Sequence, residues 1–289
     1  RMVMINVELK GGAVKEFENG TTPAEIAKSI GAGLYKSVCC AKVDGDLCDL
    51  RTPLGKDCKV ELLTFDNVDG QKTFWHTASH VLAQAVKRLY PNAKCAIGPA
   101  VDNGFYYDFD VEKPFSPEDL EKIKAEMKKI VKSGLELERV ELSPEEAEKK
   151  LEEMNEPYKV ELVKEHSDKG EHITFYKQGE FIDLCAGPHL MSVAPIKAIE
   201  LTACTGAYWR GDANNAQLCR VYGVAFPKAS MLEEHLKKLE EAKLRDHNKL
   251  GRELEYFTTV DYVGQGLPIL LPKGARVVQL LQRWVEDVE

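Results

Sequence analysis

The sequence lacks the patterns that mark several large classes of protein. It has no run of 18 apolar residues, so we predict no membrane-spanning helix and no membrane partner. The first residues hold no apolar core of the kind found in secretion signals, and we expect a cytoplasmic location. Eight cysteines are scattered without a CxxC pair, which is typical of reduced thiols rather than of a disulfide framework.

Positive charge is also in short supply. The chain carries 39 Lys and Arg against 47 Asp and Glu, a formal net charge of -8. This balance argues against a protein that coats nucleic acid nonspecifically, because phosphate backbones attract cations. It leaves room for a local basic pocket that takes one RNA end, since net charge describes only the average field. The length of 289 residues and the 44% hydrophobic content indicate two or three globular domains.

Residues 1–65 form the first predicted domain. The turn Lys10-Gly11-Gly12 joins two strand-like runs, and a capping box at Thr22 and Glu25 begins a helix that ends near Ile30. The strand-like runs of this domain are Met4–Leu9, Ala13–Glu18, Ser37–Val43, Gly45–Leu50 and Cys58–Leu63. This order predicts a β-grasp, ubiquitin-like fold. The domain contains no histidine, which favours a binding or positioning role over catalysis.

Residues 66–228 form a second predicted domain of the α+β class. Helical periodicity covers Thr73–Leu89, and the caps Ser116 and Ser143 begin two further helices that end near Lys132 and before Pro157. The strand-like runs are Phe105–Phe109, Glu136–Leu142, His172–Lys177, Glu180–Leu184, Ala198–Cys204 and Cys219–Ala225. Strands and helices in this order predict a mainly antiparallel sheet.

The last two predicted regions are a linker and a partial domain. Residues 229–253 are dense in Glu and Lys at helical spacing, which predicts one long solvated linker helix capped by Ser230. Residues 254–289 begin a new unit and end in an amphipathic helix from Ala275. Because that helix has no terminating signal, we expect the chain to stop inside a further domain.

Two distant stretches carry the side chains of greatest chemical interest. In His76-Thr-Ala-Ser-His80 the two imidazoles lie four residues apart and therefore share one helix face. In Asp183-Leu-Cys-Ala-Gly-Pro-His189 the Gly-Pro turn presents Cys185 and His189 at the end of a strand. Imidazoles and a thiol bind zinc or move protons near neutral pH. We predict that His76, His80, Cys185 and His189 share one pocket, while an HxxxH pair alone is also a common surface feature.

Other candidate residues are ambiguous by themselves. Tyr107 alternates along a strand and is either core or a hydroxyl donor to a ligand; Lys159 is by default a surface lysine, and Gly98 by default a turn. Thr205–Asp212 is an aromatic-basic turn that by default packs with an Arg–Asp pair. We interpret the remaining histidines as surface or structural residues: His166, His172, His235 and His247.

Together these segments resemble bacterial threonyl-tRNA synthetases. The resemblance is carried by the two motifs above, by the turn Ala207–Asp212 and by the segment Arg245–Phe257, in the family's order. It implies an N-terminal TGS domain of β-grasp fold, a second additional domain that edits, a linker helix and the start of a class II catalytic domain. The parts that bind ATP, Mg²⁺ and the catalytic zinc would follow residue 289, so we expect no aminoacylation from this chain, and a homodimeric parent.

The resemblance also implies an editing site that hydrolyses seryl-tRNA(Thr) at the aminoacylated 3′ end. Lys159 and His76 would hold or activate water, Cys185 and Asp183 would bind the amino acid, and His80 and His189 would orient the ribose. Tyr107 and Gly98 match further substrate-binding positions. The family edits without a cofactor, whereas related alanyl editing proteins hold zinc on the same four groups, so zinc stays an alternative. A free-standing hydrolase and a non-catalytic RNA-binding module also stay open.

Overall fold

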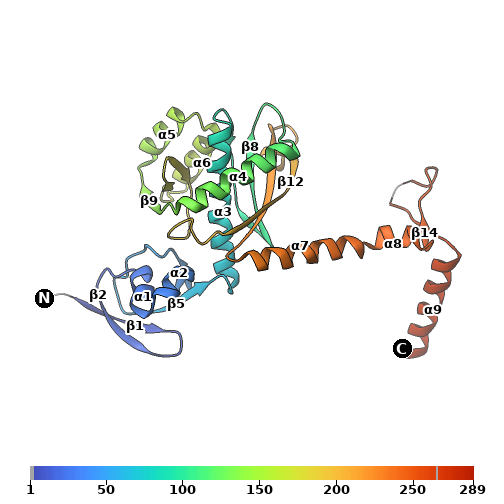
Figure 1. Ribbon diagram of the computed structural model, residues 1–289, viewed down its shortest axis with the longest axis horizontal. Coiled ribbons are helices and arrows are strands. Elements are labelled where there is room, and N and C mark those ends of the chain that lie inside the picture. Colours follow the sequence, from blue (N-terminus) through green and yellow to red (C-terminus); the bar gives the residue numbers. More distant parts are fainter. Residues whose placement is uncertain (1–2, 265) are drawn as a thin grey trace. The chain divides into compact units, whose positions relative to one another are not determined.

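A computed structural model describes residues 3–264 and 266–289 (Figure 1). The predicted first domain begins at residue 1, and residues 1 and 2, like residue 265 in the last predicted region, lie outside the described part. No described helix is long and apolar enough to cross a membrane. The described chain divides into two compact units, Arg1–Leu232 and Glu233–Glu289, which are described separately below.

The N-terminal sheet has the strand order β2-β1-β5-β3-β4. Strand β1 (Met4–Leu9) alternates exposed and buried residues, as predicted, and pairs antiparallel with β2 (Val14–Glu18) and parallel with β5 (Cys58–Thr64). Helix α1 (Pro23–Ile30) begins at the predicted capping box and buries Ile26 and Ala27 against this sheet. The α1 helix packed on a mixed sheet is the arrangement expected of a β-grasp fold.

Two local features of this region were not predicted from the sequence. The segment before β3 (Val38–Val43) forms a further short helix, α2 (Ala32–Ser37), ahead of β4 (Asp46–Cys48). Within β3 the neighbouring Cys39 and Cys40 side chains are both buried, whereas a regular half-buried strand points successive side chains to opposite faces. A register shift between Val38 and Cys40 in the β3–β5 pairing breaks the strict period of two.

Helix α3 (Val68–Leu89) is the central element of Arg1–Leu232. It is capped by Asn67 and begins a turn earlier than the apolar period predicted, because residues 68–72 are mostly polar. Figure 1 shows α3 running between the group α5, α6 and β9 and the strands β8 and β12. It is buried along most of its length, and Gly70 lets it approach β5, since an added Cβ would lie 1.9 Å from the Thr64 carbonyl oxygen.

One side of α3 packs on a five-stranded antiparallel sheet. Its order is β12-β13-β8-β6, with β7 also paired to β8. The strands are β6 (Lys94–Cys95), β7 (Ala100–Val101), β8 (Gly104–Asp110), β12 (Ala198–Tyr208) and β13 (Gln217–Phe226). Helix α4 (Pro117–Ser133) contacts α3 and β12, and it begins at Ser116 and ends at left-handed Gly134, as predicted. These contacts make one core with α3.

A second, three-stranded antiparallel sheet has the order β11-β10-β9. Its strands are β9 (Leu137–Glu141), β10 (Thr174–Gln178) and β11 (Phe181–Leu184). Helices α5 (Pro144–Glu153) and α6 (Pro157–Asp168) pack with it. The prediction treated Pro157 as the end of α5, but Pro157 also begins α6, because proline suits the first helical position.

Residues 233–289 form the second compact unit, and most of helix α7 (Ala229–Leu244) belongs to it. The predicted single linker helix is wrong in one respect: α7 ends, and Asp246 caps a separate helix, α8 (His247–Glu253). The capping carboxylate accepts a hydrogen bond from the Lys249 backbone, which starts a new helix. The strands β14 (Phe257–Thr258) and β15 (Ile269–Leu270) then pair antiparallel, and the amphipathic helix α9 (Pro272–Val288) follows.

Candidate functional site

The two distant motifs meet in one cluster. His76 and His80 lie on successive turns of α3, and Cys185 and His189 lie on the loop that follows β11. The Cys185 Sγ atom is 3.3 Å from Nε2 of His76 and 3.1 Å from Nε2 of His189. One potential ligand atom from each of these four residues lies within 4.8 Å of the other three. The structure therefore brings together the four groups that sequence reasoning singled out.

The loop after β11 turns sharply at Gly187-Pro188. Gly187 has φ of 77°, and an added Cβ would lie 2.3 Å from the Tyr176 hydroxyl oxygen, so only glycine fits. The Gly187 backbone N–H donates to the Cys185 Sγ atom over 3.2 Å. This turn returns the chain toward α3, where Thr77 Oγ1 lies 3.0 Å from Nδ1 of His189. Thr77 lies inside the His76–His80 motif and was not recognised from the sequence.

A buried ion pair lies beside this cluster. Lys159 Nζ is 2.8 Å from Asp183 Oδ1, and both side chains are at most 5% exposed. The Tyr107 hydroxyl donates to Asp183 Oδ2 over 2.6 Å, and His80 Nε2 lies 3.6 Å from the same oxygen. Lys159 is therefore buried beside the cluster, and the default of a surface lysine was wrong. The residue is brought there by α6, the helix that sequence reasoning missed.

Gly98 lies against the aromatic ring of Tyr107. A Cβ added at Gly98 would lie 2.0 Å from the Tyr107 Cδ2 atom, so glycine is required for this approach. The Gly98 carbonyl oxygen accepts a hydrogen bond of 2.6 Å from the Ser79 hydroxyl on α3. The backbone at Gly98 is thus fixed at the edge of the site.

Burial keeps the three imidazoles neutral. Desolvation lowers the pKa of His76 to about 4 and that of His80 to about 3, although the Asp183 carboxylate opposes the shift in both. Desolvation, reinforced by His76 and His80, puts the pKa of His189 well below its ordinary value. Nδ1 of His80 has no hydrogen-bond partner among the described residues. A buried polar nitrogen of this kind is costly unless a substrate group or water binds it.

The ion pair stays charged. Burial by itself lowers the pKa of Lys159, but the Asp183 carboxylate outweighs it and the pKa is raised. Burial by itself raises the pKa of Asp183, but Lys159 and His80 outweigh it and the pKa is lowered. Lys159 is therefore a fixed cation near neutral pH, which can donate hydrogen bonds but cannot accept a proton.

The four-residue cluster has the composition of a zinc site. Tetrahedral zinc takes imidazole nitrogens and thiolates at about 2.0–2.3 Å, and atoms within 4.8 Å of one another can close on such an ion. Burial, however, raises the pKa of Cys185 to about 12, so the thiol is protonated without a cation. The thiol then bonds to the two neighbouring imidazoles. The four side chains therefore fit a zinc ion, and without an ion the Cys185 thiol and the neighbouring imidazoles form hydrogen bonds with one another.

The cluster opens into a cavity of about 370 Å³. His76, His80, Lys159, Asp183 and Cys185 line it, together with Gly98 and the loop to Gly187. His166 and His172 also line this cavity, although His172 is exposed and His166 partly exposed, as their interpretation as surface residues predicted. Both histidines reach the cavity because α6 and the residues that lead into β10 form one of its walls. This wall could not be predicted from the sequence, because α6 itself was not predicted.

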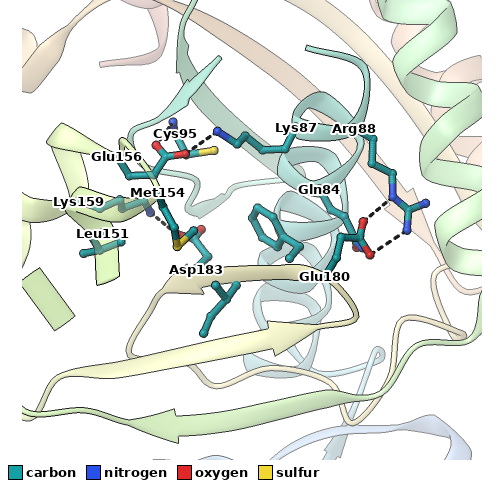
Figure 2. Close-up of a pocket in the computed structure, with 12 residues that line it drawn as sticks. Gln84, Lys87, Arg88, Cys95, Leu151, Met154, Glu156, Lys159, Glu180 and Asp183 are labelled. Carbon is teal, nitrogen blue, oxygen red and sulfur yellow. Dashed lines mark hydrogen bonds and ion pairs between the residues drawn. The ribbon is translucent and has the colours of Figure 1, made fainter. Parts of the chain in front are cut away.

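A second cavity, of about 250 Å³, lies behind the ion pair and shares Lys159 and Asp183 with the first. Figure 2 shows two further ion pairs in its wall, Lys87–Glu156 and Arg88–Glu180. Glu156 also accepts a hydrogen bond from the Cys95 backbone over 2.7 Å. These contacts fix β6 to the start of α6 and so support the position of Lys159.

The turn at residues 205–212 packs differently from its default interpretation. Arg210 pairs with Glu161 of α6 rather than with an aspartate, and Trp209 Nε1 donates to the same glutamate over 3.1 Å. Trp209 stacks edge-on with Tyr158 at a centroid distance of 5.0 Å. The turn therefore contacts and stabilises α6, the helix that carries Lys159.

Two segments match known domain families. Residues 5–64 match the TGS domain, and residues 173–222 match the threonyl and alanyl tRNA synthetase second additional domain. The second segment contains Asp183, Cys185 and His189. Together the matches define the class of protein as aminoacyl-tRNA synthetases with an editing-type domain.

Curated relatives narrow this class. Proteins named threonine–tRNA ligase from Clostridium perfringens and Acetivibrio thermocellus are 57% and 54% identical over 99% and 98% of this chain. Another from Clostridium tetani is 56% identical over 97%. The chain spans 44–45% of the length of these relatives. The chain belongs to the threonine–tRNA ligase family.

Proposed function

We propose that this chain hydrolyses the ester of seryl-tRNA(Thr), removing serine attached in error to the threonine tRNA. The observation that carries the proposal is the cavity in which neutral imidazoles, a thiol and a buried Lys159–Asp183 pair face one space. Hydrolysis of an aminoacyl ester needs a positioned water, a group that relays its proton and donors for the developing oxyanion. The site supplies a group that can relay the proton and donors for the oxyanion, and the cavity has room for the water.

The protonation states indicate which part of the hydrolysis each residue performs. His76 is neutral and lines the cavity, so its imidazole can accept a proton from the attacking water. Lys159 is a fixed cation and donates a hydrogen bond to the water or to the oxyanion. It does not take the proton of the water. Asp183 and Cys185 bind the amine and hydroxyl of the amino acid. His80, which lines the cavity, orients the ribose end, and His189 holds Cys185 in place.

Selectivity in this proposal is steric. Serine and threonine differ by one methyl group, which is worth only about 1–3 kcal/mol in a binding pocket. A synthetic site built for threonine therefore admits serine at an appreciable rate. A second pocket that takes serine but is too small for the threonine methyl removes the error. Gly98, which lines the cavity, is the proposed size-limiting residue, and the buried Tyr107 ring behind it fixes its position.

The test is a deacylation assay with matched substrates. Seryl-tRNA(Thr) and threonyl-tRNA(Thr) are incubated with the chain, with His76→Ala and Lys159→Met variants, and with His247→Ala as a control on exposed α8. We expect rapid loss of serine, slow loss of threonine, at least hundredfold slower hydrolysis by both site variants, and wild-type rates for the control. Equal hydrolysis of the two esters would contradict the steric selection against threonine. If neither ester is hydrolysed, the proposed hydrolase activity is wrong and an RNA-binding module is the better explanation.

The longer protein that contains this segment is proposed to be a cytoplasmic, homodimeric ligase that charges threonine onto its tRNA with ATP and Mg²⁺, using a catalytic zinc. In this chain we propose four regions: a TGS domain at 1–65, an editing domain at 66–228, a linker at 229–253 and the start of a class II catalytic domain at 254–289. The 3′ end of the aminoacylated tRNA is the proposed partner. This chain alone is proposed not to aminoacylate.

Hydrolysis is proposed to need no metal. The Cys185 Sγ atom lies at hydrogen-bond distance from the His76 and His189 imidazoles, so these groups satisfy one another without an ion. We expect dialysis against a chelator to leave the deacylation rate within twofold, and elemental analysis of chelator-free protein to find less than 0.1 zinc per chain. Stoichiometric zinc together with loss of activity on its removal would establish the alternative.

A further inference from the structure

We propose that Asp49 and Arg51, in the connection between β4 and β5, are positioning residues for the His189 imidazole. The inference rests on the proposed ester hydrolysis and assigns a part in it to the N-terminal β-grasp region. Neither residue lines the cavity that holds the cluster. Both reach the loop that carries Cys185 and His189 by contacting its backbone.

The contacts bracket His189 on both sides. The Asp49 carboxylate accepts a hydrogen bond from the His189 backbone N–H over 3.1 Å. The Arg51 guanidinium donates to the His189 carbonyl oxygen over 3.3 Å and to the Leu190 carbonyl oxygen over 2.7 Å. It also donates twice to the Leu137 carbonyl oxygen of β9, over 3.1 and 2.9 Å. Both peptide groups of His189 are thus held by one ion pair, of which Asp49 is buried and Arg51 is partly buried.

The ion pair is itself firmly held. Arg51 Nη1 lies 3.0 Å from Asp49 Oδ1, and the Arg51 backbone N–H donates to the same oxygen over 2.9 Å. The Tyr176 hydroxyl donates to Asp49 Oδ2 over 2.8 Å. Asp49 is 7% exposed and Tyr176 is 1% exposed, so these bonds lie out of water. Buried charge-assisted bonds of this kind fix geometry because breaking one leaves a costly unpaired group.

The position of the His189 backbone determines the position of its imidazole ring. The Tyr176 ring packs on the His189 ring at a centroid distance of 4.4 Å. The ring's Nδ1 faces Thr77 and its Nε2 faces Cys185 at hydrogen-bond distance, so a small shift of the His189 backbone breaks both contacts. Misplacing a catalytic constellation by about 1 Å can cost about a hundredfold in rate. Asp49 and Arg51 therefore influence hydrolysis without touching substrate.

The experiment uses the full 289-residue chain with Arg51→Met and Asp49→Asn, variants that keep side-chain volume. Asp57→Asn is the matched control, because Asp57 is exposed and accepts the Asn6 backbone N–H, in the same N-terminal region. We expect kcat for seryl-tRNA(Thr) to fall tenfold to a hundredfold in both variants, with KM changed less than threefold. The control is expected to match wild type, and circular dichroism establishes that each variant is folded.

A second readout separates this inference from the proposed function. Histidine-ring nitrogen NMR reports the His189 ring directly, and its signals are expected to shift and broaden in Arg51→Met while those of His247 stay unchanged. If Arg51→Met does not fold, Tyr176→Phe, which removes one bond to Asp49, is expected to produce a smaller shift and a threefold to tenfold fall in kcat. Wild-type kcat and unchanged ring signals in the variants overturn the positioning role. A wild-type chain without hydrolysis overturns the proposed function, and the ring signals still decide the positioning.

Discussion

At the residue scale, the site depends on which buried groups carry charge. Lys159 and Asp183 keep their charges because they pair with each other, whereas the buried histidines lose theirs because no carboxylate fully compensates their desolvation. The result is one fixed dipole beside a set of neutral imidazoles. Two measurements probe these states separately.

The first concerns the Lys159–Asp183 pair. Lys159→Met leaves the Asp183 carboxylate buried without its cation, and we expect the free energy of unfolding to fall by about 3–5 kcal/mol. Adding Asp183→Asn removes the stranded charge, so the double variant is expected to be more stable than Lys159→Met alone. Urea unfolding of the two single variants and the double variant measures the coupling. Additive losses would show that the two groups do not interact.

The second concerns pH. The folded-state pKa of His80, about 3, lies below its unfolded value, so the unfolded chain binds the extra proton as the pH falls through 6.5. His80 therefore contributes no penalty above that pH and destabilises the fold increasingly below it. Between pH 7.5 and pH 5 we expect His80→Gln to lose about 2 kcal/mol less unfolding free energy than wild type. Parallel urea titrations at several pH values test this, and identical slopes would contradict a neutral buried His80.

At the element scale, the caps and periods of the sequence predicted most helices and strands of residues 66–228. Ser116, Ser143 and Gly134 begin and end helices where expected, because caps satisfy backbone groups locally. Helix α6 was missed because its apolar residues follow no strong period. It is held instead by partners far along the chain, including Asp183, Asp110 and Trp209.

A substitution at Gly98 measures how strongly the packing of neighbouring elements constrains the site. Gly98→Ala places a methyl group against the Tyr107 ring, and we expect a loss of about 1–3 kcal/mol in stability and at least tenfold in deacylation rate. Gly33→Ala is the control, because Gly33 lies on exposed α2 with no atom within 4 Å of an added Cβ. It is expected to leave activity unchanged and to raise stability by up to about 1 kcal/mol. Thermal unfolding and the deacylation assay decide, and a fully active Gly98→Ala would show that Tyr107 can move.

At the scale of the whole molecule, the two compact units differ in how much they bury. Helix α3 buries fourteen residues, whereas α7 buries none and α8 and α9 bury only Gly251 and Gly274 among their described residues. Helices without tertiary packing are marginal in water. We therefore expect backbone amides of α7–α9 to exchange with deuterium at least a hundredfold faster than those of α3. Comparable protection in the two sets would contradict this expectation.

The sequence by itself determined most of the strands and helices, several helix caps and the two motifs that supply His76, His80, Cys185 and His189, because these depend on local hydrogen bonds and on side-chain period. Only the tertiary structure decided that Lys159 is buried against Asp183, that His166 and His172 line the cavity and that Asp49 and Arg51 hold the His189 backbone. These relations join residues as many as 140 positions apart. Their free energy comes from desolvation and pairing in the folded core, and no local pattern encodes it.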